Sequence, residues 1–251
     1  MRSRPVQLTT SGHVATLAIS SGLDGNRLDR ATVAALADSL QTIAQDDNVR
    51  VAILTGTADT FCTGTEIGTL SAETLYSLRI ASHIAGFDKP MIAAIEGDAT
   101  DQGLEIALAC DIRIAADDAR FGMTQISRGL MPWDGGTQRL PRLIGRGRAT
   151  ELLLTGRLID ASEALEAGLV SEMTPRDQVA VRAHQIASII ASHGPIAARY
   201  LKEAVASGLD TSLPQALRLE ADLNFILQTT SDRAEGIDSF LERRPPHYTG
   251  E

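Results

Sequence analysis

The sequence predicts an α/β fold that combines strands and helices in its early half and continues with helices in its late half. Two short, almost continuous apolar runs, 49–54 (VRVAIL) and 90–95 (PMIAAI), are typical of strands covered on both faces. Segments with helical spacing of apolar residues lie between and after them. With 251 residues the chain is long enough to bury a core, and one domain with a C-terminal extension is the simplest division.

The early half begins with an alternating segment and a helix. Residues 13–20 (HVATLAIS) alternate between apolar and small or polar side chains, which predicts a strand, and the turn sequence SSGLDGN follows. After Leu28 the apolar spacing becomes three or four residues, which predicts a helix ending near Asp46. Its buried face consists of Val33, Leu36, Leu40 and Ile43. Further on, 103–109 (GLEIALA) suits a buried helix and 111–116 (DIRIAA) a strand.

The late half is predicted to be helical. A helix over 148–155 has Gly156 as a C-terminal cap, and Asp160 with Glu163 matches a capping box that opens a helix stopping at Gly168. Three more helices are expected over 196–207, 213–229 and 232–243. We therefore expect a core over residues 1–195 and a helical region over 196–251, which packs on the core or on a neighbouring subunit.

Composition excludes several classes of function. The formal charge of −9 and the isoelectric point near 5.1 argue against nucleic acid as a partner, because phosphate backbones are bound by clustered Lys and Arg. No apolar run approaches the roughly 20 residues that span a bilayer, and no apolar run follows the first residues, so a cytoplasmic location is expected and no membrane partner. Cys62 and Cys110 are expected to be reduced, buried thiols, and no Cys/His spacing indicates a metal.

Two segments at predicted strand ends carry the candidate chemistry. Residues 61–67 (FCTGTEI) and 97–105 (GDATDQGLE) both place small residues and glycine where ligands bind in α/β sheets. The second segment leads into a helix, whose N-terminal amides favour negative charge. Such glycine turns are also common in loops that bind nothing, so each segment alone is a weak signal.

Further sequence blocks occur in a fixed order along the chain, and together they identify a family. The blocks include Asn26-Arg-Leu28, Phe61 to Ile67, Lys89 to Gly97 (KPMIAAIEG), Cys110 to Ala115 (CDIRIA), Gly135 to Leu140 (GGTQRL) and Asp232 to Gly236 (DRAEG). Over nearly its full length the chain resembles the crotonase superfamily, also called the enoyl-CoA hydratase/isomerase family. The resemblance implies a crotonase-like spiral of ββα units with a helical C-terminal region. It also implies a homotrimer or dimer of trimers that binds acyl-CoA thioesters, with no cofactor because coenzyme A belongs to the substrate.

The resemblance implies an oxyanion site made of two backbone amides. By position these belong to Thr65 and Gln102, and they would hold the thioester oxygen as it becomes an enolate. Fixed backbone donors suit this task, since losing one oxyanion donor typically costs on the order of 10²–10³ in rate. Family hydratases commonly have glycine where this chain has Asp101 and Gln102. Asp101 is expected to cap the following helix with its side chain.

Hydratases of this family use two glutamates, and this chain matches one of them. Glu105 occupies the first position, whereas the second is Gln125, which cannot exchange a proton at neutral pH. Asp134 is a candidate replacement acid, and capping the helix after Gly135 is an equally good explanation for it. Trp133 beside it either shapes an acyl pocket that accepts a ring or belongs to the core.

The resemblance also implies contacts to the substrate. We expect coenzyme A to meet the backbone near Arg27 and Thr63, and the thioester to lie against Gly64, Gly103 and Trp133. The variable segment 71–87 often walls the acyl pocket in this family. In this chain its candidate specificity residues are Tyr76, Leu78, Arg79 and His83.

The functional hypothesis is an enzyme that stabilises a thioester enolate. The leading reading is an enoyl-CoA hydratase or isomerase acting on a branched or cyclic enoyl-CoA, with Glu105 as the main acid/base and Asp134 or Gln125 as its auxiliary. A hydrolase or decarboxylase of the same fold is the alternative within enzymes. A non-catalytic acyl-CoA-binding member is the alternative outside them, because the second glutamate is missing.

Overall fold

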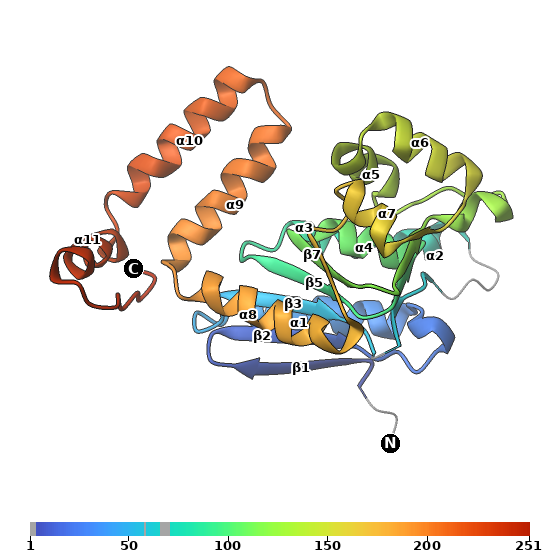
Figure 1. Cartoon of the computed structure of the whole chain (residues 1–251), viewed down its shortest axis with the longest axis horizontal. Helices are drawn as coiled ribbons and strands as arrows, with labels where there is room; N and C mark the ends of the chain where they lie inside the picture. The colour runs from blue at the N-terminus through green and yellow to red at the C-terminus, as the bar shows by residue number, and fades with distance from the viewer. Residues whose placement is uncertain (1–3, 58, 66–70) are drawn as a thin grey trace.

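The computed structural model describes residues 4–57, 59–65 and 71–251, and its strands form two sheets that share a core (Figure 1). The larger sheet has the order β1 (Val6–Ser11), β2 (Val14–Ile19), β3 (Val51–Thr55), β5 (Met91–Ile95), β7 (Ile112–Ala116) and β10 (Glu172–Thr174). The smaller sheet has the order β4 (Thr60–Cys62), β6 (Asp98–Thr100), β8 (Arg120–Gly122) and β9 (Ile159–Asp160).

The chain winds as a spiral in which each turn adds one strand to each sheet. β3 is followed by β4, β5 by β6 and β7 by β8, and within each sheet these strands pair in parallel. The helices that connect or cover them are α1 (Arg30–Ala44), α2 (Ala72–Ser77), α3 (Ala81–Ala85), α4 (Gln102–Ala109), α5 (Gly136–Ile144), α6 (Arg146–Thr155), α7 (Ala161–Glu166) and α8 (Val179–Ala191). The predicted ββα spiral is therefore confirmed.

Burial explains why the apolar runs form strands. Every residue of β5 is buried, and so are the first four of β3, as the two continuous runs predicted. The helix expected after Leu28 is α1, which starts at the N-cap Asp29 and buries Val33, Leu36, Leu40 and Ile43 against the sheet. Cys62 and Cys110 are free and buried, as expected.

Several elements were not anticipated from the sequence, most of them strands that are short or lack a clear period. β1 pairs with β2 as an antiparallel hairpin, and four of its six residues are exposed. β4, β6 and β8 have three residues each, too few to show an alternating pattern. α8 lies across the large sheet and was not anticipated either.

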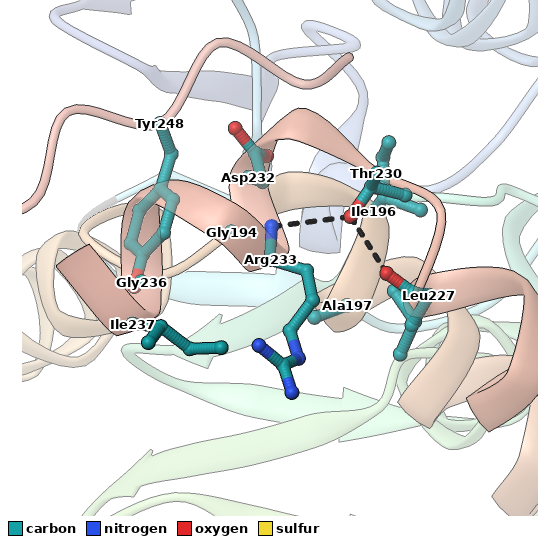
Figure 2. A pocket seen from close by; sticks show the side chains of 10 residues that line it. All are labelled: Gly194, Ile196, Ala197, Leu227, Thr230, Asp232, Arg233, Gly236, Ile237 and Tyr248. Carbon is teal, nitrogen blue, oxygen red and sulfur yellow. Dashed lines mark hydrogen bonds between the residues drawn. The ribbon is translucent and has the colours of Figure 1, made fainter.

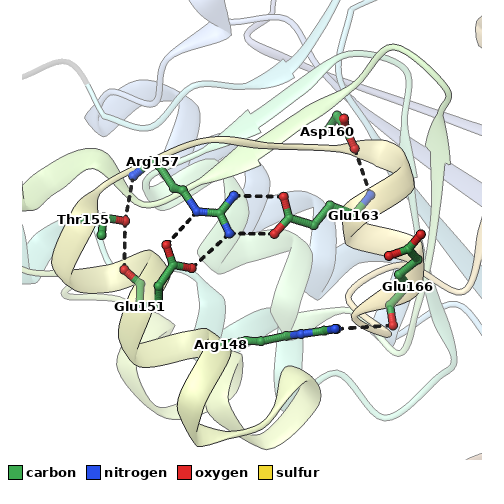
Figure 3. Close-up of polar contacts among 7 residues, drawn as sticks. All are labelled: Arg148, Glu151, Thr155, Arg157, Asp160, Glu163 and Glu166. Carbon is green, nitrogen blue, oxygen red and sulfur yellow. Dashed lines mark hydrogen bonds and ion pairs between the residues drawn. The ribbon is translucent and has the colours of Figure 1, made fainter.

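The link between α6 and α7 corrects one prediction (Figure 3). Gly156 caps α6 in the left-handed conformation, as expected, and the Asp160 carboxylate accepts from the Glu163 amide. The reciprocal half of the capping box is absent from the hydrogen bonds of these residues, because the Glu163 carboxylate pairs with Arg157 at 2.6 Å. Arg157 also binds Glu151 at 2.7 Å, so one guanidinium bridges the two helices.

The C-terminal helices α9 (Pro195–Leu209), α10 (Leu213–Leu227) and α11 (Ser231–Glu242) leave the two sheets (Figure 1). α9 and α10 form an antiparallel pair that extends away from the core, and α9 is tied to the sheet by the Lys202 ammonium, 2.8 Å from the Asp111 carboxylate. None of the helices among the described residues has the length and apolar character required to cross a membrane.

Asn26 joins the two sheets close to the site. Its side-chain amide donates to the carbonyl oxygens of Ile19, at the end of β2, and Phe61, in β4, at 2.9 and 2.8 Å. Its Oδ1 accepts from the Ser21 amide at 3.0 Å, and the residue is buried. Its φ of 50° lies in the left-handed region, which asparagine tolerates better than most residues.

We expect Asn26→Ala to lower the free energy of unfolding by about 2–4 kcal/mol, because two buried carbonyl groups lose their donor. Chemical denaturation of the purified variant measures this loss. The exposed Asn48→Ala should change the free energy by less than about 0.5 kcal/mol. Equal stability of the two variants would contradict this role of Asn26.

Candidate active site

The two segments singled out in the sequence lie against each other, at the end of β4 and the start of α4. Gly103 packs so closely on β4 that an added Cβ would lie 1.9 Å from the Cys62 carbonyl oxygen. A Cβ on Gly64, whose φ is 103°, would lie 2.8 Å from the Asp101 Cβ and 3.5 Å from the Gln102 nitrogen. Glycine at both positions lets the first turn of α4 approach the strand end. Glu66 and Ile67 of the first segment lie outside the described residues.

The amides of Thr65 and Gln102 are brought to this contact. Gln102 is the first residue of α4, so its N–H has no acceptor within the helix. Neither amide donates a hydrogen bond to any of the described residues, although both residues are buried. The two residues are also joined directly, because the Thr65 hydroxyl donates to the side-chain oxygen Oε1 of Gln102.

Asp101 does not cap α4 with its side chain, contrary to the prediction. The residue occupies the N-cap position, but its carboxylate makes no capping bond. It accepts instead from the Thr124 amide at 2.6 Å and pairs with Arg128 at 2.5 Å. A φ of 52° turns the side chain towards these partners, so the charge of Asp101 is neutralised away from the helix start.

Glu105 is fully buried one turn into α4. Its Oε1 accepts from the amides of Asp134 and Gly136 at 2.7 and 2.8 Å, while Oε2 has no partner among the described residues. Burial raises the pKa of this carboxyl to about 7, and the two amides offset only part of that effect. Both protonation states of Glu105 are therefore populated near neutral pH.

Asp134 does not cap the helix that follows it, since α5 begins at Gly136 with Gly135 as its N-cap. The buried Oδ2 accepts from the amides of Ile80 and Ala81 at 2.9 and 3.1 Å, at the start of α3, and from Nε2 of Gln102 at 2.9 Å. Oδ1 lies 3.8 Å from Nε of Arg79 and accepts no hydrogen bond from the described residues. Asp134 thus holds α3 against α4.

Among the described residues, buried side-chain atoms without a hydrogen-bond partner are confined to a few residues of α4 and of the segment before α5. Within the described part of the chain, such atoms occur in four residues: Glu105, Gln125, Trp133 and Asp134. Both amide atoms of Gln125 are among them, and so is the indole nitrogen Nε1 of Trp133. Because unpaired buried polar groups are costly, their confinement to α4 and segment 125–134 indicates a place where a polar ligand is bound.

The residues expected to contact coenzyme A lie beside this site. Thr63 is joined to the loop before α1 by its amide and its hydroxyl, which both donate to the Gly25 carbonyl at 2.9 and 2.8 Å. The Arg27 guanidinium, in the same loop, binds Asp24 at 3.1 Å. The Leu28 amide donates to the Gly64 carbonyl at 2.8 Å, which fixes the loop to the oxyanion segment. Their contact with a ligand stays a prediction.

The cavity in Figure 2 lies elsewhere, among the C-terminal helices. It has a volume of about 240 Å³ and is lined by residues of α9, the end of α10, α11 and Tyr248. The carboxylate of Asp232, which lines this cavity, already accepts hydrogen bonds from the Thr249 and Gly250 amides at 2.7 and 3.1 Å. Across residues 4–57, 59–65 and 71–251, no group of three or more His, Cys, Asp or Glu side chains could hold a metal.

The raised pKa of Glu105 predicts a pH-dependent stability. The folded state favours the protonated form, so this stabilisation is present below pH 4.5 and is lost as the pH rises through about 7. Glu105→Gln removes the ionisation and keeps an acceptor for the two amides. We therefore expect the variant to gain stability relative to the wild type by up to about 3 kcal/mol between pH 5 and pH 8.

Thermal or urea unfolding at the two pH values measures this difference. The exposed Glu166→Gln serves as the matched control, for which the difference from the wild type should be the same at both pH values. A pH-independent effect of Glu105→Gln on stability would show that burial does not raise the pKa of this carboxyl.

Known proteins share both the sequence and the fold of the chain. A family profile described as enoyl-CoA hydratase/isomerase matches residues 9–251. The chain is 39% identical to (E)-benzylidenesuccinyl-CoA hydratase of Thauera aromatica, over 98% of this chain and 99% of that protein. It is 38% identical to 2,3-dehydroadipyl-CoA hydratase of Escherichia coli, over 90% of this chain and 91% of that protein.

A crystal structure of enoyl-CoA hydratase from Bacillus anthracis has a TM-score of 0.95 to this fold at 38% identity, and the match covers 98% of this chain and all of that one. The family match runs from β1 through both sheets and the C-terminal helices, so the likeness is not confined to one motif. The chain therefore belongs to the enoyl-CoA hydratase/isomerase family, as an enzyme of the crotonase fold that acts on acyl-CoA thioesters.

Proposed function

We propose that the protein stabilises the enolate of an enoyl-CoA thioester and catalyses either water addition or double-bond migration. The observation that supports this proposal is the pair of buried residues Thr65 and Gln102, which follow β4 and begin α4 and whose amides donate no hydrogen bond to the described residues. The N-terminus of α4 adds a positive dipole at the place where the thioester oxygen becomes negative.

Glu105 is the main acid/base in this proposal. Its Oε2 is buried and has no partner among the described residues, so it can meet a substrate or water, while Oε1 is held by two amides. A pKa of about 7 suits a group that must both take up and release a proton at neutral pH. The neighbouring Asp134 carboxylate adds to the effect of burial on this pKa.

The chain is an atypical hydratase in our proposal, because Gln125 stands where the second glutamate is expected. Its buried amide can orient water or a carbonyl oxygen, but it transfers no proton. One titrating carboxyl then performs the proton transfer. Oδ1 of Asp134, buried and without a hydrogen bond among the described residues, is the auxiliary group that could receive a proton or position water.

For the acyl group we propose a branched or cyclic chain. Trp133 is half-buried beside Asp134, where an aromatic ring can pack against a cyclic substituent. Relatives of the chain are named for benzylidenesuccinyl-CoA, crotonyl-CoA and 2,3-dehydroadipyl-CoA, so acyl groups differ widely at similar identity. The benzylidene group of the first supports a pocket that admits a ring.

We also propose assembly into a trimer or a dimer of trimers through the C-terminal helices. Large apolar side chains on α9–α11 are 64–81% exposed at Leu201, Val205, Leu209, Leu213, Phe225, Phe240 and Leu241. Such a surface is typical of a face that packs on another subunit. Light scattering that finds only single chains at micromolar concentration would contradict this assembly.

Incubation with enoyl-CoA thioesters in deuterated water tests the reaction. We expect mass spectrometry to detect hydrated or isomerised product, with deuterium at the carbon next to the thioester. Free acid or carbon dioxide would assign the chain to hydrolysis or decarboxylation instead. Binding of the thioester with neither product nor exchange would contradict the enolate proposal and favour a non-catalytic acyl-CoA-binding protein.

Glu105→Gln should lower turnover and deuterium exchange by at least about 10², because the proton-transferring group is removed while its hydrogen bonds are kept. Steady-state kinetics and the exchange assay measure both. Glu166→Gln, an exposed change of the same type, should retain wild-type rates. Wild-type turnover by Glu105→Gln would remove Glu105 from the mechanism.

A further inference from the structure

We propose that the side chain of Gln102 is a positioning residue that holds the two amides of the oxyanion site in a fixed relation to Glu105. This inference rests on the proposed function and assigns a role to the side chain, whereas the enolate proposal uses only the backbone amide of Gln102.

The Gln102 side chain is fully buried, and its oxygen and both N–H groups form hydrogen bonds with three separate segments. Oε1 accepts from the Thr65 hydroxyl, after β4. Nε2 donates to the Leu78 carbonyl at 2.6 Å, between α2 and α3, and to Oδ2 of Asp134 at 2.9 Å, before α5. One side chain therefore ties the start of α4 to all three surrounding segments.

The same contacts continue to Glu105 without a break. The Thr65 hydroxyl donates to Gln102, Gln102 donates to the Asp134 carboxylate, and the Asp134 amide donates to Oε1 of Glu105 at 2.7 Å. All four residues are buried, with 4% exposure or less. Thr65, Gln102, Asp134 and Glu105 thus form one connected network of hydrogen bonds, which we call the frame. Within it, Gln102 contacts both Thr65 and Asp134.

The chemistry of these partners requires an amide. Thr65 needs an acceptor at this point, whereas the Leu78 carbonyl and the Asp134 carboxylate need donors, and a primary amide provides one oxygen and two N–H groups. The partners also determine the amide orientation, since a flipped amide would place its oxygen against two acceptors. Glycine or alanine here would leave all three partners short of a bond, and a carboxylate would repel Asp134.

The expected consequence is a loss in the chemical step rather than in binding. Oxyanion donors act over a narrow range, about 2.7–3.1 Å from the developing charge, so a small displacement of Thr65 weakens them. Coenzyme A is expected to bind at Arg27 and Thr63, outside this frame. A variant without the side chain should therefore bind the thioester almost normally and turn it over slowly.

Gln102→Ala tests this expectation. We predict that kcat falls by about 10² while KM for the acyl-CoA changes by less than about threefold. Gln41→Ala, an exposed glutamine in α1, is the matched control and should retain both constants. A kcat within about threefold of the wild type in a folded Gln102→Ala protein would overturn the proposal.

Gln102→Glu provides a second test that does not depend on truncation. The new carboxyl faces the Asp134 carboxylate, with Glu105 one turn along α4 and the Arg79 guanidinium beyond Asp134; the nearby Asp101 is paired with Arg128. When protonated it can donate one bond to Asp134, and when ionised it repels Asp134 and opposes the enolate. The ratio of variant to wild-type kcat should fall at least tenfold from pH 6 to pH 8.

A constant ratio over that range would also overturn the proposal, whether or not Gln102→Ala folds. Failure of this inference is distinct from failure of the proposed function. If the wild type neither converts nor exchanges any enoyl-CoA, the enolate proposal fails; if it does and both Gln102 variants keep its rate and pH profile, only the role of the side chain fails.

Discussion

The candidate site depends on the close approach of the first turn of α4 to the end of β4. Gly103 permits it, because any larger residue would meet the Cys62 carbonyl, and the Thr65–Gln102 side-chain bond closes it. Without this contact the two amides would belong to unrelated loops. With it, the spiral of ββα units places the strand end next to the helix start, where we propose the backbone site for negative charge.

A second constraint is the burial of charge around that contact. Glu105 and Asp134 are both fully buried, but they differ in the hydrogen bonds that they accept. Asp134 takes three donors on one oxygen and anchors α3, whereas Glu105 keeps one oxygen without a partner among the described residues and has its pKa raised to about 7. Asp101 is also close to the start of α4, but its carboxylate is bound by the Thr124 amide and the Arg128 guanidinium.

Much of this could be predicted from the sequence, and the misses have physical reasons. The buried runs in β3 and β5 and the apolar face of α1 are local patterns, so they were visible. Three-residue strands such as β4 and β6 are stabilised by their neighbours and carry no period of their own. The predicted cap at Asp101 was wrong, and the capping alternative at Asp134 is excluded, because Arg128 and the α3 amides bind these carboxylates in place of the local amides.

The network through the Gln102 side chain joins residues 24 to 37 positions apart, which no local pattern reveals. A crystal structure of the protein with a non-reactive acyl-CoA thioester or enolate analogue would test the proposed oxyanion site. We predict that the thioester oxygen lies about 2.7–3.1 Å from the backbone nitrogens of Thr65 and Gln102, with the carbon next to it facing Oε2 of Glu105. A thioester oxygen bound instead to Gln125 or Trp133, away from both amides, would contradict the account.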